Sequence, residues 1–260
     1  MTLSGFTAPY TPTGKSSLVP SPPWHYAGQV LSIAFDVDPR KAGAFLPSGF
    51  GEPTGRAFAH FCEWQATTDG SELVDPIYAQ YKEFFVLIEA AHPSVTGTAL
   101  FCPLIYVDQD ISMVRGLLQG WPKKMGSVWM TRSYDLDHPA AAPIRKGSRF
   151  GASLSVKDRR LAEAKVTLDG KEGEPLGFLA LPTFGIVGGP TLIGGPSAGS
   201  RTLVRASVPS KVSGRVLSAD AELYFFPSPR DELSDLAPSR VENATLSTFG
   251  LTIDGAVEVP

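Results

Sequence analysis

One stretch of this 260-residue sequence decides how its fold and chemistry are interpreted: Gly120-Trp121-Pro122-Lys123-Lys124-Met125-Gly126. Adjacent lysines usually lie on a solvated surface, and a solvated turn after a helix is one interpretation of this pair. Here, however, they follow an apolar stretch and stand between a Trp-Pro pair and a Met-Gly turn, which favours a place beside a pocket. Two ammonium groups held close together each disfavour the other's charge, and an uncharged lysine amine is a nucleophile toward ketones.

The residues just before this stretch predict a buried strand followed by a short helix. Thr98 to Val107 is largely apolar, as expected of a strand that is covered on both faces. Asp108-Gln109-Asp110 is placed to cap a helix, whose apolar residues then recur at helical spacing, namely Met113, Val114, Leu117 and Leu118. The helix is expected to end at Gly120, because Pro122 cannot continue it comfortably.

Most of the remaining chain predicts short strands, as its 26 glycines and 23 prolines suggest. Residues 30–37 alternate, residues 57–66 and 83–91 are further candidates, and Asp38-Pro39 begins a short helix. The second half resembles a β-meander, with strands expected at 127–134, 150–156, 161–168, 179–187, 203–208 and 215–226. Asp169-Gly170 is one of its expected turns. We expect residues 1–27 to form an extended N-terminal arm and residues 28–260 a single domain.

Composition narrows the class of protein. A formal net charge of −3 argues against a nucleic-acid partner, and 43% hydrophobic with 19% charged residues fits a soluble globular protein. Neither a secretory signal nor a membrane-spanning run is evident, and Cys62 and Cys102 are expected to be free thiols, so we expect a cytoplasmic protein. We expect no metal site, because strand alternation would separate His60, Cys62 and Glu63 between two faces.

The order of these motifs resembles that of the acetoacetate decarboxylase superfamily. Tyr106-Val107-Asp108-Gln109-Asp110 is followed by a short helix and then by the lysine segment, and Tyr81-Lys82-Glu83 is similar to the family's Tyr-x-Glu. The resemblance implies a mostly β (α+β) fold, a double β-sheet or cone with a few short helices. It also implies a homo-oligomeric, cofactor-free protein that acts on a small oxo acid.

The resemblance also assigns roles to individual residues. Lys123 would be the lysine that forms a Schiff base, and Lys124 the neighbouring cation that favours the uncharged amine. Glu83 would be the pocket carboxylate that orients groups or transfers a proton. Without the resemblance, the favoured interpretation of Glu83 is an ordinary surface glutamate beside Lys82.

Three positions depart from the family's decarboxylase. Gly28 stands where that enzyme has an arginine on its first strand, and Cys62 stands where it has a second pocket glutamate, or Glu63 if the register slips by one residue. Gln119, four residues before Lys123, is similar to members that act as aldolase-dehydratases or cyclase-dehydratases on 2-oxo acids. Alternatively, Gln119 bonds a free carbonyl at the helix end. Phe249 lies where related dehydratases place a tyrosine.

The sequence therefore predicts a cofactor-independent Schiff-base lyase. We expect an imine at Lys123, with Lys124 and Glu83 in catalytic roles and Gln119, Trp121 and Phe249 at the substrate. The departures favour aldol condensation and dehydration of a 2-oxo acid such as pyruvate with an aldehyde co-substrate. The alternatives are decarboxylation of a 3-oxo acid such as acetoacetate, and a non-catalytic binding protein on the same scaffold. One iminium electron sink serves all these reactions, so the lysine predicts the intermediate better than the product.

Overall fold

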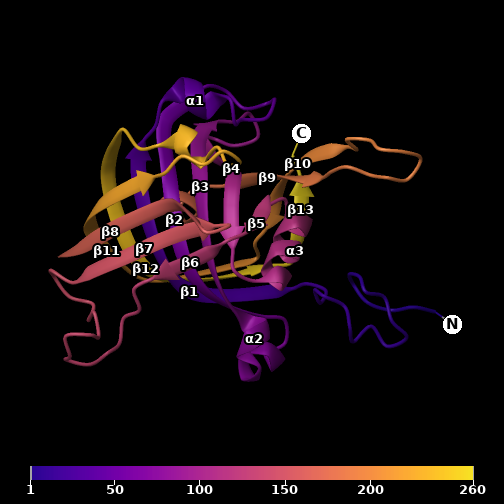
Figure 1. Ribbon diagram of the computed structural model, residues 1–260, viewed down its shortest axis with the longest axis horizontal. Coiled ribbons are helices and arrows are strands. Elements are labelled where there is room, and N and C mark those ends of the chain that lie inside the picture. The colour runs from indigo at the N-terminus through magenta and orange to yellow at the C-terminus, as the bar shows by residue number, and fades with distance from the viewer. Residues whose placement is uncertain (1, 260) are drawn as a thin grey trace.

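A computed structural model describes residues 2–259 as one large curled mixed sheet of 13 strands with a few short helices (Figure 1). The strand order is β13-β10-β9-β4-β3-β2-β1-β12-β11-β8-β7-β6, and β5 pairs with β4 outside this path. The strands are β1 (Trp24–Asp36), β2 (Pro53–Thr67), β3 (Gln80–Ala91), β4 (Thr98–Val107), β5 (Lys123–Met125), β6 (Ser127–Met130), β7 (Arg149–Val156), β8 (Arg159–Glu172), β9 (Thr183–Gly188), β10 (Arg201–Ser207), β11 (Ser210–Phe225), β12 (Arg240–Ile253) and β13 (Gly255–Glu258). The α-helices are α1 (Pro39–Gly43), α2 (Pro76–Ala79) and α3 (Asp110–Gln119). The predicted mostly β fold is confirmed.

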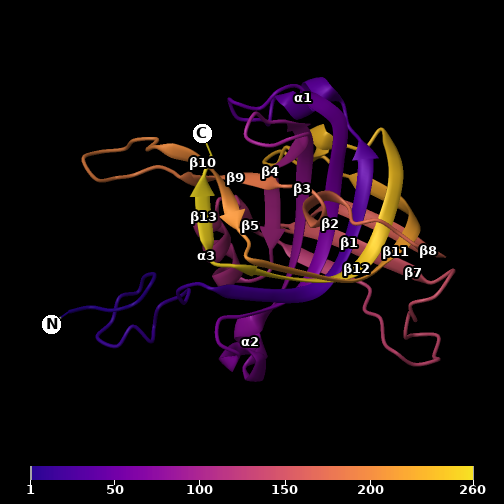
Figure 2. The ribbon, with the colours of Figure 1, turned by 180° about the vertical axis from the view of Figure 1, so that it is seen from behind.

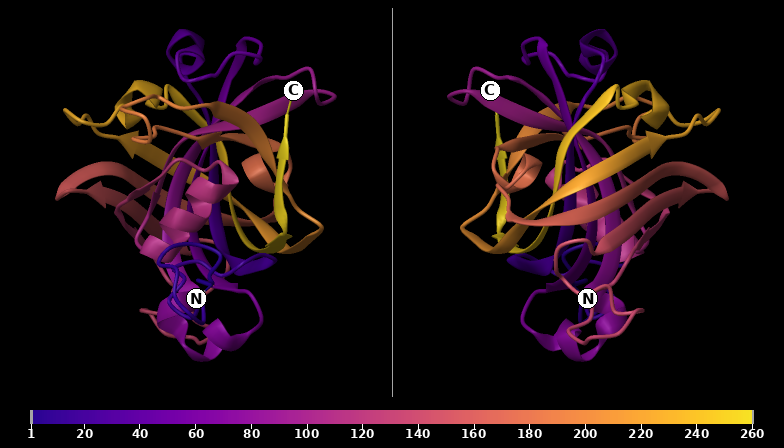
Figure 3. Two further views of the ribbon diagram at one scale, coloured as in Figure 1. Left: turned by 90° about the vertical axis from the view of Figure 1, so that its right-hand side faces the viewer. Right: turned by 90° about the vertical axis from the view of Figure 1, so that its left-hand side faces the viewer.

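The central strands β1, β2, β3 and β4 are covered on both faces, and this produces two separate cores. Because side chains alternate along a strand, Phe61 and Phe84 face one core while Cys62 and Phe85 face the other. The first core lies where β6, β7, β8 and β11 cross the central strands, as the side views show (Figure 3). The second core lies beneath α3 and contains the segment before β5. Each central strand thus presents a different set of residues to each core.

Several predicted elements are confirmed. β4 spans the predicted residues 98–107, α1 starts after Asp38, whose side chain accepts a hydrogen bond from Arg40 N at 2.9 Å, and α3 ends at Gln119. Of the predicted cap of α3, Asp110 bonds the first turn by accepting from Ile111 N at 2.8 Å, but the N-cap residue Gln109 makes no side-chain hydrogen bond to the helix and Asp108 does not cap it. Instead, Asp108 accepts a hydrogen bond from Lys82 N at 2.6 Å and ties β4 to β3.

Other features of the fold were not predicted. β12 was missed entirely, although it pairs with β1 over its full length, on the side of β1 opposite β2 (Figure 2). The predicted turn at Asp169-Gly170 is wrong: both residues lie inside β8, at an irregularity in its pairing with β11. The segment around the two lysines forms the short strand β5, parallel to β4, rather than a turn. These strands depend on partners distant in sequence, so local patterns do not reveal them.

Three segments extend from the body of the sheet: the residues before β1, the connection between β6 and β7, and the hairpin of β9 and β10 (Figure 1). Hydrogen bonds within the N-terminal residues hold this segment together. Thr7 N donates to Ser17 Oγ, and the hydroxyls of Thr7 and Ser17 both donate to Val19 O. Within residues 2–259, no helix combines the length and the apolar character needed to span a membrane.

Candidate active site

The position of Lys123 is fixed by α3 and β4 together. Trp121 N donates to Gly116 O at 2.9 Å after the last helical turn, and Lys123 pairs with Ile105 in the parallel ladder of β5 and β4. The aliphatic chain of Lys123 lies directly on Gly116, where an added Cβ would come within 2.3 Å of Lys123 Cδ. A glycine at position 116 is therefore required by the close approach of the lysine to the helix.

The amine of Lys123 is buried beside a carboxylate. Nζ lies 2.6 Å from Glu83 Oε2, and both side chains are only 8% exposed. The contact is close but is not aligned as a hydrogen bond, and Nζ instead donates to Ser112 Oγ at 3.0 Å. The ring of Tyr81 lies beneath the amine, with its centroid 5.3 Å from Nζ. This places the carboxylate within proton-transfer reach of the amine.

Glu83 is held by the strand on its other side. It lies on β3 opposite Cys62 of β2, and Trp64 Nε1 donates to Glu83 Oε1 at 3.3 Å. Glu83 is buried, so the surface glutamate interpretation is wrong. Burial and then the Glu83 charge raise the pKa of Cys62 well above its usual value, which leaves the neighbouring thiol protonated and a poor nucleophile.

A small cavity of about 60 Å³ opens onto Lys123 and Glu83. Gln119 and Trp121 line it, together with mostly apolar and aromatic side chains, namely Tyr26, Trp64, Tyr81, Phe85, Ile105, Phe178, Leu251 and Ile253. The cavity is thus several times larger than the roughly 10–15 Å³ that a single water needs. Gln119 Nε2 donates to the Tyr26 hydroxyl at 3.2 Å, rather than to a helix-end carbonyl.

Lys124 lies on the other face of the sheet. Alternation along β5 pairs it with Tyr106, whose ring faces the first core, and Lys124 Nζ is 2.5 Å from Asp231 Oδ2. The Tyr106 hydroxyl donates to Asp231 Oδ1 at 2.6 Å, so one buried carboxylate joins both groups. Lys124 thus has a carboxylate of its own and does not share a pocket with the amine of Lys123.

Phe249 is close to the cavity without lining it. It is buried on β12, and its ring centroid lies 5.6 Å from that of Phe178, which forms part of the wall. The structure therefore brings Lys123, Glu83, Gln119 and Trp121 together around one cavity, leaves Phe249 one ring behind it, and separates Lys124 from it.

The structure gives a physical reason for one departure from the decarboxylase pattern and settles the register of another. A Cβ at Gly28 would come within 2.1 Å of Glu63 O, so the first strand has no room for a side chain at that position. Cys62 faces the same core as Phe85, whereas Glu63 lies on the other face of β2, 3.4 Å from Arg132. No register slip therefore brings Glu63 into the cavity.

Arg115 is a buried residue of this region that the sequence analysis missed. It lies on α3 one turn before Gln119, and its guanidinium carbon is 5.6 Å from the Tyr26 ring centroid. Burial raises the pKa of Tyr26 and of Tyr81, and the nearby Arg115 charge acts against that rise in both. The four-residue spacing of Arg115 and Gln119 on one helix is the signal that could have revealed it.

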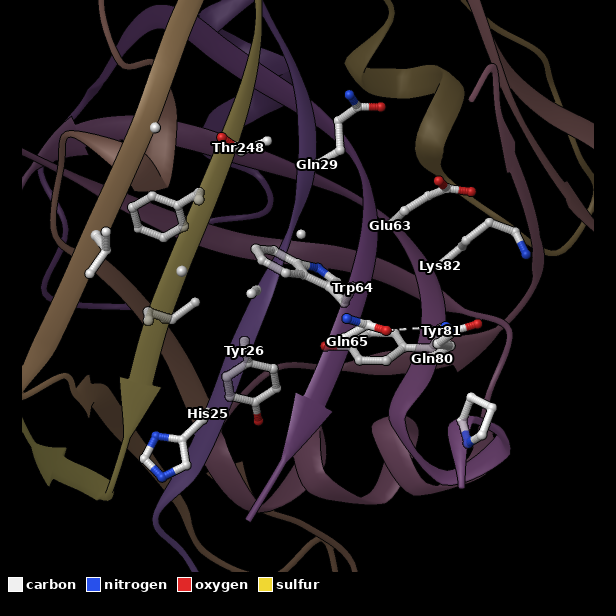
Figure 4. Close-up of a pocket in the computed structure, with 18 of the residues that line it drawn as sticks. His25, Tyr26, Gln29, Glu63, Trp64, Gln65, Gln80, Tyr81, Lys82 and Thr248 are labelled. Carbon is white, nitrogen blue, oxygen red and sulfur yellow. Dashed lines mark hydrogen bonds between the residues drawn. The ribbon is translucent and has the colours of Figure 1, made fainter. Parts of the chain in front are cut away.

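A larger open groove of about 1240 Å³ borders the cavity (Figure 4). Gln29, Glu63 and Lys82 line it. The charge of Lys82 is compensated, because its Nζ lies 2.9 Å from Asp108 Oδ2. Neither Lys123 nor Glu83 is part of its lining. The groove and the cavity share the wall residues Tyr26, Trp64, Tyr81 and Leu251, and the amine lies on the cavity side of that wall.

Comparisons with known proteins agree with the observed fold. The family model of acetoacetate decarboxylase matches residues 7–259. The enduracididine biosynthesis enzyme MppR, in its complex with the condensation product of pyruvate and imidazole 4-carboxaldehyde, has a TM-score of 0.92 and 31% identity, over 99% of this chain and 97% of that chain. MppR complexed with pyruvate has a TM-score of 0.91 and 31% identity, over 99% and 98% of the two chains.

An acetoacetate decarboxylase-like enzyme from Sphingomonas wittichii RW1 has a TM-score of 0.89 and 24% identity, over 99% of this chain and 100% of that one. At that identity the likeness concerns the fold alone. No curated protein matches the sequence.

Proposed function

This chain belongs to the acetoacetate decarboxylase family, and from that premise we propose that it is a cofactor-independent enzyme that joins a 2-oxo acid such as pyruvate to an aldehyde through a Lys123 imine. The observation that carries the proposal is the buried Lys123 amine, 2.6 Å from the Glu83 carboxylate and facing a small, mostly apolar cavity. An amine in such a place, beside a group that can take its proton, can add to a ketone.

The two residues are sufficient for imine formation. An ammonium group cannot attack a ketone, so Lys123 must first give up a proton, and Glu83, 2.6 Å away, is placed to accept it. The amine then adds to the ketone carbon, Glu83 gives its proton to the departing hydroxyl, and loss of one water leaves a protonated imine and the Glu83 carboxylate. The positive nitrogen withdraws electrons from the adjacent carbon, which can then lose a proton to Glu83 and become an enamine.

The enamine carbon attacks the aldehyde carbon, and the new alkoxide takes a proton from Glu83. The carbon between the imine and the hydroxyl-bearing carbon then loses a proton, and the hydroxyl leaves with that proton as water. The product, an unsaturated oxo acid, is still bound to Lys123 as the imine. Hydrolysis of the imine consumes one water, which balances the water lost when the imine formed, and frees the lysine. The sum is pyruvate plus aldehyde giving the unsaturated oxo acid and one water.

Two observations favour condensation over decarboxylation. Gly28 excludes the first-strand arginine, and Cys62 replaces the second pocket carboxylate, so two groups of the decarboxylase pattern are missing from the cavity. MppR, 31% identical over nearly the whole chain, binds pyruvate and a pyruvate–aldehyde condensation product. Decarboxylation of acetoacetate is the second candidate, supported by the family match and by the shared imine.

Borohydride trapping tests the proposal. The protein is incubated separately with pyruvate and acetoacetate, reduced, digested and mapped by mass spectrometry. We expect an adduct on the Lys123 peptide that disappears in Lys123→Ala, while Lys41→Ala, which removes an exposed lysine, keeps it. An unsaturated product with pyruvate and imidazole 4-carboxaldehyde supports condensation, whereas release of carbon dioxide from acetoacetate supports the second candidate. No adduct with either ketone would contradict both enzymatic functions and favour the binding protein.

A further inference from the structure

Phe178 forms one wall of the cavity at Lys123 from a connection between two strands. It lies in the 3₁₀-helix η2 (Gly177–Leu179), between β8 and β9, and its side chain is only partly buried. The backbone hydrogen bonds of this helix run from Leu179 N and Ala180 N to carbonyls one turn earlier. Among residues 2–259, η2 belongs to no strand ladder, so side-chain packing seats Phe178 on the sheet.

Four aromatic rings surround the ring of Phe178. Their centroids lie between 4.9 and 6.4 Å from its own, at interplanar angles from 63° to 87°, and they belong to His60, Phe85, Phe249 and Trp64. Edge-to-face pairs of this kind are favourable, so the ring has a well-defined place in the wall. All of these contacts are made by side chains, so a smaller side chain at position 178 would leave the backbone of the sheet unchanged.

The other residues that line the cavity cannot yield as readily. They lie on β1, β2, β3, β4 and β12, or on the segment from Gln119 to Lys123 that joins α3 to β5. Each of these strands pairs with a neighbour on both sides, so moving one of them would break two ladders of hydrogen bonds. The segment between α3 and β5 holds the reacting lysine itself. Phe178 is thus the part of the wall that can move aside at the least cost.

With Phe178 in place, the cavity is too small to hold an aromatic ring beside Lys123. Its volume is about 60 Å³, whereas a protein cavity that binds benzene measures about 150 Å³. During a condensation, the imine must nevertheless share this space with a second substrate. Displacement of the Phe178 ring would free room for one aromatic ring directly beside the cavity.

We propose that Phe178 is the specificity-determining residue of this site and limits the size of the carbonyl compounds accepted beside Lys123. Small aliphatic ketones and aldehydes fit with its ring in place. A compound with an aromatic substituent, such as imidazole 4-carboxaldehyde, reacts more slowly because it must displace that ring. The inference rests on the proposed function, because it assumes that these compounds react at the Lys123 amine. Phe178 thus selects the substrate, while Lys123 and Glu83 carry out the reaction.

Borohydride trapping of two methyl ketones tests this role. The half-saturating concentrations of acetone and acetophenone are measured for wild type, Phe178→Leu and Phe178→Ala. The ratio of the acetophenone value to the acetone value should fall on the order of 10- to 100-fold in Phe178→Ala, because the overpacking caused by the phenyl group is relieved. Phe178→Leu should lie between the other two. A general structural defect would change both concentrations together and leave the ratio constant.

Acylation of Lys123 tests the same wall without an imine. The protein is treated with acetic or benzoic anhydride, digested and mapped by mass spectrometry. The benzoyl-to-acetyl ratio at Lys123, divided by that at the exposed Lys41, should rise on the order of 10- to 100-fold in Phe178→Ala. Phe50→Ala is the matched control for both measurements, since Phe50 is also partly buried and packs on three aromatic rings but does not line the cavity.

Three results would overturn the inference: an unchanged ketone ratio in Phe178→Ala, an unchanged anhydride ratio in that variant, or an equal change in Phe50→Ala. Failure of the proposed function gives a different pattern. In that case neither wild type nor the variants trap a ketone at Lys123, while the anhydride ratio still rises in Phe178→Ala.

Discussion

Replacement of Gly116 by alanine should nearly abolish imine formation while leaving the protein folded. The added Cβ would lie 2.3, 2.5 and 2.6 Å from Cδ, Cε and Cγ of Lys123, whereas ordinary contacts begin at 3.4 Å. The lysine chain must therefore move by about 1 Å along most of its length. A displacement of that size in a reacting group costs about 100-fold in rate.

The cost to stability should be small by comparison. Alanine is about 0.8–1.0 kcal/mol more favourable than glycine in a helix interior. Overpacking of a buried site costs about 1–3 kcal/mol, so the net loss is about 2 kcal/mol or less. A variant that melts cooperatively but reacts slowly with ketone would thus separate positioning of the lysine from folding.

The assay is the rate of borohydride-dependent labelling of Lys123 with pyruvate, beside a urea unfolding curve. Gly43→Ala is the matched control, since Gly43 also lies on a helix but a Cβ there would meet nothing closer than 3.6 Å. Labelling of Gly116→Ala at the wild-type rate would refute the reasoning, as would an equal loss in Gly43→Ala.

Four further predictions concern residues around the site. Burial lowers the pKa of His60 to about 3, so only the unfolded chain binds a proton there as pH falls below about 6.5. The free energy of unfolding should therefore drop by about 2 kcal/mol between pH 7 and pH 5. Urea titrations should show that His60→Gln loses this part of the pH dependence, and an equal drop in the variant would contradict the prediction. Asp231→Ala removes the partner of the buried Tyr106 hydroxyl and should lower the free energy of unfolding, measured by urea titration, by about 1–3 kcal/mol. Lys124→Met should leave the pH profile of Lys123 labelling unchanged, because the Lys124 ammonium lies on the opposite face; a profile moved to higher pH would show that Lys124 acts electrostatically on Lys123. Gly28→Ala should destabilise the fold by about 3 kcal/mol, because the new Cβ would clash with the main-chain oxygen of Glu63, which cannot move as a flexible side chain can. A melting temperature equal to that of wild type would contradict this and show that β1 and β2 can separate there.

The sequence was sufficient to predict the elements with strong local patterns. The apolar run of β4, the helical spacing in α3 and the Asp38-Pro39 start of α1 each specify their element from neighbouring residues. Lys123, Gln119 and Trp121 could be placed together because a few residues of chain join α3 to β5.

The rest depends on contacts between distant parts of the chain. β12 carries few local strand signals, and its long ladder with β1 becomes visible only in the folded sheet. Glu83 reaches Lys123 because β3 and β5 flank β4, and no sequence pattern near Glu83 records that arrangement. Nor could the sequence show that alternation places the two lysines on opposite faces, because a turn was one interpretation of this segment and no strand was expected there.

The alternation of β5 has a consequence for how this segment tolerates insertions and deletions. A slip of one residue would turn Lys123 away from the cavity and bring in a neighbour, either Lys124 or Pro122 according to the direction of the slip. With Lys124 in its place, the slipped strand would still present a primary amine to the cavity. The doubled lysine thus makes the nucleophile tolerant of one of the two single-residue register errors.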